Sequence, residues 1–205
     1  MKPFVPTVGL ALALSSAVTF AQAAAPAPLP TRVRGTIESL NGESLTVAVR
    51  KGQKVTIEVP ENATVTALTV SKLAEVKPGS YIGTAAVPQP DGTLKALEVQ
   101  VFPESMRGVG EGSRPWDLGS QSSMTNGTVG QVEGAAEGRS LTVRYGGSEK
   151  KVVVPPDVPV VTYEPGTRGM LVPGAHVIIN AAKVADGTLS ADRVTVGKDG
   201  LVPPM

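Results

Sequence analysis

The sequence predicts an all-β protein made of two tandem small β-barrels joined by an ordered connector of 21 residues. Three observations carry this prediction. Apolar residues alternate with polar ones at the period of a β-strand. The 205 residues include 23 glycines and 18 prolines, which indicates many tight turns. Most of the chain also repeats once in the same order, which indicates a tandem pair of domains rather than a long repeat array.

The first 23 residues have the features of an export signal. Lys2 precedes an apolar run from Val8 to Phe20, and Ala21-Gln22-Ala23 is the small-residue pattern that signal peptidase cleaves. We expect cleavage between Ala23 and Ala24. The apolar run is shorter than the roughly 20 residues of a membrane-spanning helix, so a retained anchor is the weaker alternative.

The remaining boundaries follow from composition and from the repeat. Residues 24–30 predict a short Pro/Ala-rich tether. We expect a first barrel repeat over 31–102, a connector over 103–123 and a second barrel repeat over 124–198, followed by a tail at 199–205. Matching segments mark the two copies: Gly35-Thr36-Ile37 with Gly127-Thr128-Val129, Ser44–Val47 with Ser140–Val143, and Asp91–Leu94 with Asp186–Leu189.

Within the first copy, the order of elements favours a closed barrel. Residues 45–49 and 55–59 alternate as strands, and Asn41-Gly42 suits a tight hairpin. One helical turn is expected over 71–76, followed by strands over 81–87 and 94–102. This order resembles an OB-type barrel, and closure protects the strand edges of so small a unit. An open sandwich of the same strands is the alternative.

Composition excludes several classes of function. The chain has no cysteine and one histidine, so neither thiolate chemistry nor a histidine metal cage is expected, and no cofactor is predicted. A net charge of +1 argues against nucleic acid as a partner. His176 is interpreted as a strand residue rather than a catalytic base. A hydrolase is therefore only the third candidate function, because no base, metal set or cleft pattern supports it.

The connector is the candidate site. It holds the only tryptophan, which a purely flexible linker does not need. One interpretation is structural, with Trp116 packed between the barrels and the charges around it satisfying one another. The other is an exposed recognition surface, because tryptophan and arginine are common interface anchors. The candidate residues are Met106, Arg107, Glu111, Arg114, Trp116 and Asp117.

A copper(I) site is the second candidate function. Thioether sulfur is a ligand that suits copper(I), and Met106, Trp116 and Met124 fall close together in the sequence. Methionine is more often a packing residue than a ligand, which favours binding without a metal.

Several of these motifs resemble a known family. The V-x-G-T-I opening at Val33–Ile37, the S-L-T-V strand and the D-G-T hairpin are similar to exported bacterial repeats catalogued as domain of unknown function 5666. The resemblance covers roughly Thr31–Val101 and Met124–Gly197. It implies small β-barrels outside the cytoplasm and no assigned activity. Together with the composition, it predicts a non-catalytic binding or structural module that is periplasmic or secreted, with an envelope protein or polymer as partner.

Overall fold

The structure is a computed structural model that describes residues 31–135 and 138–204. The predicted signal peptide and tether lie outside the described residues. The described chain is all-β, as predicted, with fourteen strands, five short 3-10 turns and no α-helix. The strands are β1 (Thr31–Asn41), β2 (Ser44–Ala48), β3 (Lys54–Glu58), β4 (Thr64–Val70), β5 (Tyr81–Pro88), β6 (Leu94–Val101), β7 (Gly112–Pro115), β8 (Ser123–Ala135), β9 (Gly138–Tyr145), β10 (Ser148–Val154), β11 (Val160–Pro165), β12 (His176–Lys183), β13 (Leu189–Ser190) and β14 (Arg193–Gly197).

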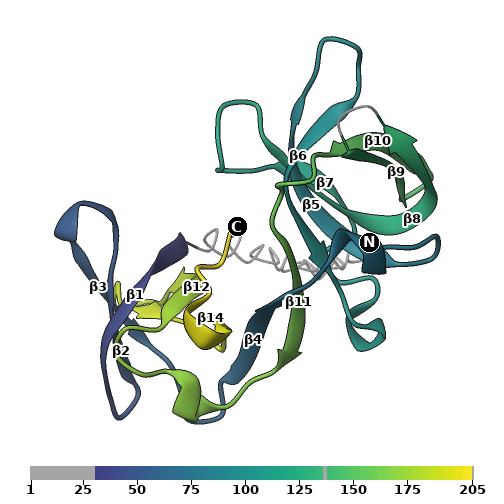
Figure 1. Cartoon of the computed structure of the whole chain (residues 1–205). Helices are drawn as coiled ribbons and strands as arrows, with labels where there is room; N and C mark the ends of the chain where they lie inside the picture. The colour runs from purple at the N-terminus through teal and green to yellow at the C-terminus, as the bar shows by residue number, and fades with distance from the viewer. Residues whose placement is uncertain (1–30, 136–137, 205) are drawn as a thin grey trace, which may run out of the picture.

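The beginning and the end of the chain close one ring of strands, which we call the terminal barrel. Strands β1, β2 and β3 pair in antiparallel order, and β3 continues in parallel to β13. Strand β12 pairs with both β13 and β1 and so closes the ring. Figure 1 shows the purple strands of the first repeat beside the yellow-green strands of the second. Ile37, Leu45 and Ile57 share the core of this barrel with Ile179 and Val194.

The middle of the chain closes a second ring, the central barrel. Strands β8, β9 and β10 pair in antiparallel order, and β10 continues in parallel to β6. Strand β5 pairs with both β6 and β8 and closes the ring. Ile82 and Val99 from the first repeat pack there with Leu141, Val143 and Val152 from the second. As the composition indicates, the two main core clusters consist of aliphatic residues.

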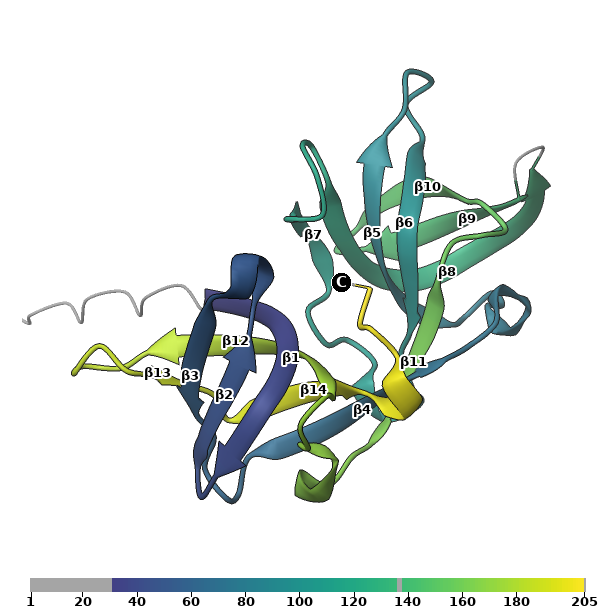
Figure 2. The same cartoon turned by 60° about the vertical axis from the view of Figure 1, so that its left-hand side comes forward.

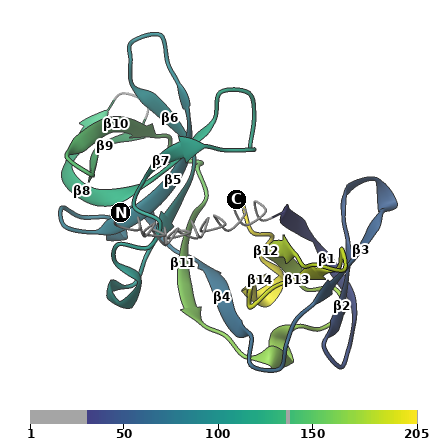
Figure 3. The ribbon, with the colours of Figure 1, turned by 180° about the vertical axis from the view of Figure 1, so that it is seen from behind.

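These pairings correct the prediction that 31–102 and 124–198 each close a barrel of their own. Each repeat contributes its first three strands to one barrel and its last strands to the other. Strands β4 and β11 carry the chain across, and they pair with each other in antiparallel register between Thr66–Val70 and Val161–Pro165. Figures 2 and 3 show this pair between the two barrels. Because the two copies have the same strand pattern, a strand can pair equally well with the other copy's equivalent.

The repeated Gly-Thr motif marks a close approach of two strands. A Cβ atom on Gly35 would lie 2.1 Å from the carbonyl oxygen of Ala48, and one on Gly127 would lie 2.4 Å from that of Arg144. Real Cβ contacts are essentially never below 3.0 Å. Only glycine therefore allows the first strand of each repeat to bend this tightly over its neighbour.

The structure also shows the helical turn and the aspartate turns that were expected from the sequence. The helical turn expected over 71–76 is a single 3-10 turn at Leu73–Glu75. Asp91 and Asp186 serve their turns, since each carboxylate accepts the backbone N–H two residues later at 2.8–2.9 Å. None of the described residues forms a helix of the length and hydropathy needed to cross a membrane.

Candidate functional site

The connector folds back onto the central barrel. Its strand β7 pairs with β8, from Gly112 opposite Asn126 to Pro115 opposite Ser123. The loop that follows is closed by its own hydrogen bonds. The backbone N–H of Trp116 donates to the Ser122 carbonyl at 2.8 Å, and the Ser122 hydroxyl donates to the backbone carbonyl of Trp116 at 2.8 Å. These bonds fix the position of the indole ring relative to β8.

Trp116 lies where the two barrels meet. Its half-buried side chain packs on a small apolar cluster of Leu68 from β4, Val161 from β11 and Ile178 from β12. The Arg32 guanidinium stacks over the indole at 3.6 Å from the ring centroid. Such a contact between a cation and an aromatic face stabilises by about 0.5–2 kcal/mol. The ring therefore joins the connector, the crossing strands and β1.

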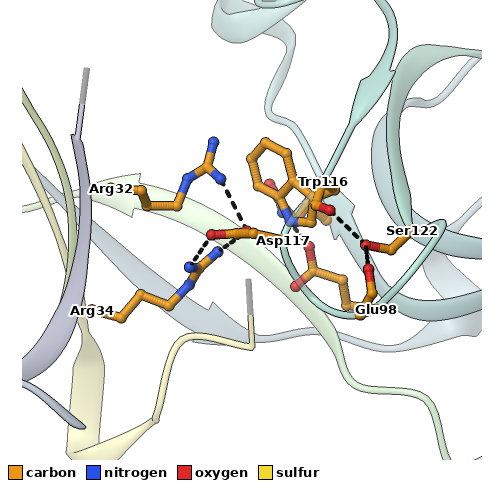
Figure 4. A network of polar contacts seen from close by, with 8 residues as sticks. Arg32, Arg34, Glu98, Trp116, Asp117 and Ser122 are labelled. Carbon is orange, nitrogen blue, oxygen red and sulfur yellow. Dashed lines mark hydrogen bonds and ion pairs between the residues drawn. The ribbon is translucent and has the colours of Figure 1, made fainter. Parts of the chain in front are cut away.

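Asp117 ties the connector to the terminal barrel. Its carboxylate accepts hydrogen bonds from Arg32 at 3.0 Å and from Arg34 at 2.7 and 2.8 Å, as Figure 4 shows. The hydrogen bonds from Arg34, together with the charges of both guanidinium groups, lower the pKa of Asp117 to about 2. Burial lowers the pKa of Arg32, and Asp117 opposes this effect.

Two of the predicted site residues face elsewhere. Arg107 pairs with Glu104 and donates to the Gly79 carbonyl at 3.0 Å, which anchors the start of the connector to the central barrel. The Glu111 carboxylate accepts the Gly146 N–H at 2.9 Å. Neither residue lines the cavity described next, so both hold the connector in place.

A cavity of about 190 Å³ lies between the connector and the two barrels. The connector contributes Met106, Arg114 and Trp116 to its wall, and β8 contributes Met124. Three of the six predicted site residues thus line this cavity. A fourth, Asp117, binds the lining residue Arg32. No barrel interior is involved, because the aliphatic cores fill both barrels.

The aromatic residues gather at the same place. Phe102 and Tyr163 line the cavity and stack at 5.2 Å between ring centroids, and Tyr81 packs against Phe102 at 5.4 Å. Trp116 completes the group. Three of the seven aromatic residues of the chain therefore line the cavity and Tyr81 packs behind them, although the four are spread over 83 positions in the sequence.

A buried polar chain runs along one side of the cavity wall. The Tyr163 hydroxyl donates to the Gln100 side-chain carbonyl at 2.6 Å, and the Gln100 amide donates to the Glu98 carboxyl at 2.7 Å. Burial raises the pKa of Glu98 to about 7, against the smaller opposing effects of Gln100 and Arg34. Burial also raises the pKa of Tyr163, and the Glu98 charge adds to this.

The three residues of the copper(I) hypothesis do come together, since Met106, Trp116 and Met124 all line the cavity. The guanidinium groups of Arg32 and Arg114 lie on the same wall, and positive charge opposes a metal cation. Among the described residues there is no group of three or more His, Asp or Glu side chains placed to hold a metal ion. His176 is not part of the cavity, and its Nδ1 lies 3.1 Å from the Thr36 hydroxyl.

Sequence reasoning missed Arg32, Arg34, Gln100, Tyr163 and Arg193. All five lie outside the connector and reach the site through strand pairings with distant segments. Arg32 and Arg34 are two apart on one strand, so they share a face, but nothing local shows that this face meets Asp117. The only usable signal was the scarcity of aromatic residues, which makes Phe102 and Tyr163 notable.

Comparison with known proteins gives one match. The model of the family described as Domain of unknown function (DUF5666) matches residues 34–100. The resemblance seen in the sequence is confirmed for this segment, which runs from β1 into β6. No curated protein and no solved structure matches the chain.

Proposed function

We propose that the protein is a non-catalytic binding module of the bacterial envelope. Its residues 34–100 match the model of the domain of unknown function 5666 family. Its recognition element is the cavity between the connector and the two barrels. The observation that supports this best is that the only tryptophan and the connector residues Met106 and Arg114 form one wall of that cavity.

The connector has a structural role as well. Trp116 packs between the barrels and Asp117 binds Arg32 and Arg34, so the connector fixes the relative position of both barrels. A rigid wall costs little ordering entropy when a ligand binds, and preorganisation of this kind favours affinity. The structural and the recognition interpretations of the connector are therefore parts of one device.

The proposed location is the periplasm or the exterior of the cell, and the proposed partner is an envelope protein or polymer. The export pattern of residues 1–23 supports the location. Absence of cysteine fits an oxidising compartment as well as a reducing one, so it does not oppose export.

Nuclear magnetic resonance of the processed, ¹⁵N-labelled chain tests the proposal. Envelope extract is separated into protein, polymer and small-molecule fractions, and each is titrated in turn. We expect one fraction to shift the resonances of Trp116 and its neighbours, and Arg114→Ala to weaken the effect. Arg144→Ala, an exposed change on β9 of the central barrel, is the matched control. Shifts confined to residues away from the cavity with every fraction contradict the proposal.

A copper(I) site is the second candidate because Met106, Trp116 and Met124 line the same cavity. Titration with copper(I) under reducing conditions distinguishes it, since a bound metal quenches the fluorescence of the single tryptophan. Unchanged emission at equimolar metal removes this candidate.

A further inference from the structure

The cavity wall carries positive charge on several sides. Arg32 from β1, Arg114 from the connector and Arg193 from β14 all line it. Of the described residues that form this wall, none is an aspartate or glutamate. Arg32 is paired with Asp117, whereas neither Arg114 nor Arg193 has a carboxylate within 4.0 Å in the described part of the chain. An adjoining depression contains Asp192, the carboxylate nearest to Arg193 in sequence.

Hydrogen-bond donors at the same wall lack partners. Within the described residues, the Trp116 Nε1 and Arg32 Nε atoms are buried and make no hydrogen bond. A buried donor without a partner destabilises the folded state. Both atoms belong to side chains that line the cavity, and both donate only. A cation cannot satisfy either atom, because both only donate.

The remaining wall is part polar, with Asn126 and Asn180 among its side chains, and part apolar. Phe102, Met106, Met124 and Ile178 face the same space. A volume of about 190 Å³ corresponds to about six water molecules at liquid density. The site therefore suits a compact group with one anionic end and an apolar body, rather than an inorganic anion.

We propose that this cavity binds a small organic carboxylate, with the carboxylate held by Arg114 and Arg193 and the apolar body against Phe102 and Met124. This inference rests on the proposed binding function, and it names the chemical class of the ligand. The carboxylate group can belong to a free acid or to a side chain or C-terminus of a peptide.

Titration of the processed chain with benzoate tests the inference, followed by the fluorescence of Trp116, the only tryptophan. Benzamide, which has the same shape without the charge, and inorganic phosphate, which lacks the apolar body, are the comparison probes. We expect saturable binding of benzoate and at least tenfold weaker binding of both others. A short peptide with a C-terminal phenylalanine is titrated in parallel. Tighter binding of benzoate indicates a free acid as the ligand, and tighter binding of the peptide indicates a chain terminus.

Variants add a second criterion. Arg114→Gln and Arg193→Gln change exposed side chains, and we expect each to weaken benzoate binding at least tenfold, while Arg144→Gln leaves it unchanged. Equal affinity for benzamide and benzoate in the natural chain overturns the inference, whatever the folding of the variants. The inference is also overturned if an envelope fraction shifts the resonances of the cavity residues and benzoate does not bind. That result leaves the proposed binding function supported. If neither fractions nor probes act on these residues, both proposals fail.

Discussion

Replacing Glu98 with glutamine is expected to remove most of a pH dependence of stability. Glu98 is fully buried on β6, and one carboxyl oxygen has no hydrogen-bond partner among the described residues. Burial raises its pKa from the ordinary 4.5 to about 7. The folded protein therefore holds a proton that the unfolded chain has already released between pH 4.5 and 7, so stability falls as pH rises through this range.

The magnitude follows from the two pKa values. One pKa unit corresponds to about 1.4 kcal/mol, so ionisation of Glu98 costs the folded state about 3 kcal/mol by pH 8. The neutral amide of Glu98→Gln has nearly the same shape and still accepts the hydrogen bond from Gln100. We expect the variant to equal the natural protein within about 1 kcal/mol at pH 5 and to be more stable by up to about 3 kcal/mol at pH 8.

Urea unfolding at pH 5, 6, 7 and 8 measures this difference. All other titratable groups are common to both proteins, so their contributions cancel when the two curves are subtracted. Glu133→Gln is the control, because Glu133 is an exposed residue whose pair with Lys151 contributes little. A difference between the natural protein and Glu98→Gln that stays constant from pH 5 to pH 8 would refute the reasoning.

Three further predictions concern the architecture. Gly35→Ala forces backbone movement at Ala48 and is expected to lower the free energy of unfolding by roughly 1–3 kcal/mol, whereas Gly134→Ala, which meets nothing within 4 Å, changes it little in the same urea assay. Asp117→Asn is expected to lower the free energy of unfolding at pH 7 by only about 1 kcal/mol, because the carboxylate is half exposed. It is also expected to speed proteolysis of the connector, and an unchanged cleavage rate contradicts this. The excised repeat 31–102 is expected to form a dimer in which two copies exchange strands as the two repeats do. Light scattering measures its mass and circular dichroism follows its unfolding. A monomer that unfolds cooperatively contradicts this prediction.

Much of the local structure was predictable because it depends on neighbours in the sequence. Alternation placed Leu45, Val47 and Ile57 in a core, and the structure buries all three. The turn roles of Asp91 and Asp186 followed from bonds that span two residues. Trp116 was predicted to be the centre of the candidate site because it is the only tryptophan, and it does lie between the barrels.

The partners of Trp116 and Asp117 were not predictable. Arg32 and Arg34 are separated from Asp117 by more than 80 residues, and they reach it only because β1 closes a barrel with β12. The exchange of strands between repeats was equally hidden, since both copies present the same apolar alternation to any partner.

The strands, the turns and the repeat can be predicted from the sequence, because they depend on side-chain alternation and on the backbone preferences of glycine, proline and asparagine. The copy with which each strand pairs, and the charges that surround the cavity, are known only from the folded chain. Strand pairing uses backbone groups that are the same in both repeats, so the choice between partners depends on how β4 and β11 direct the chain through space.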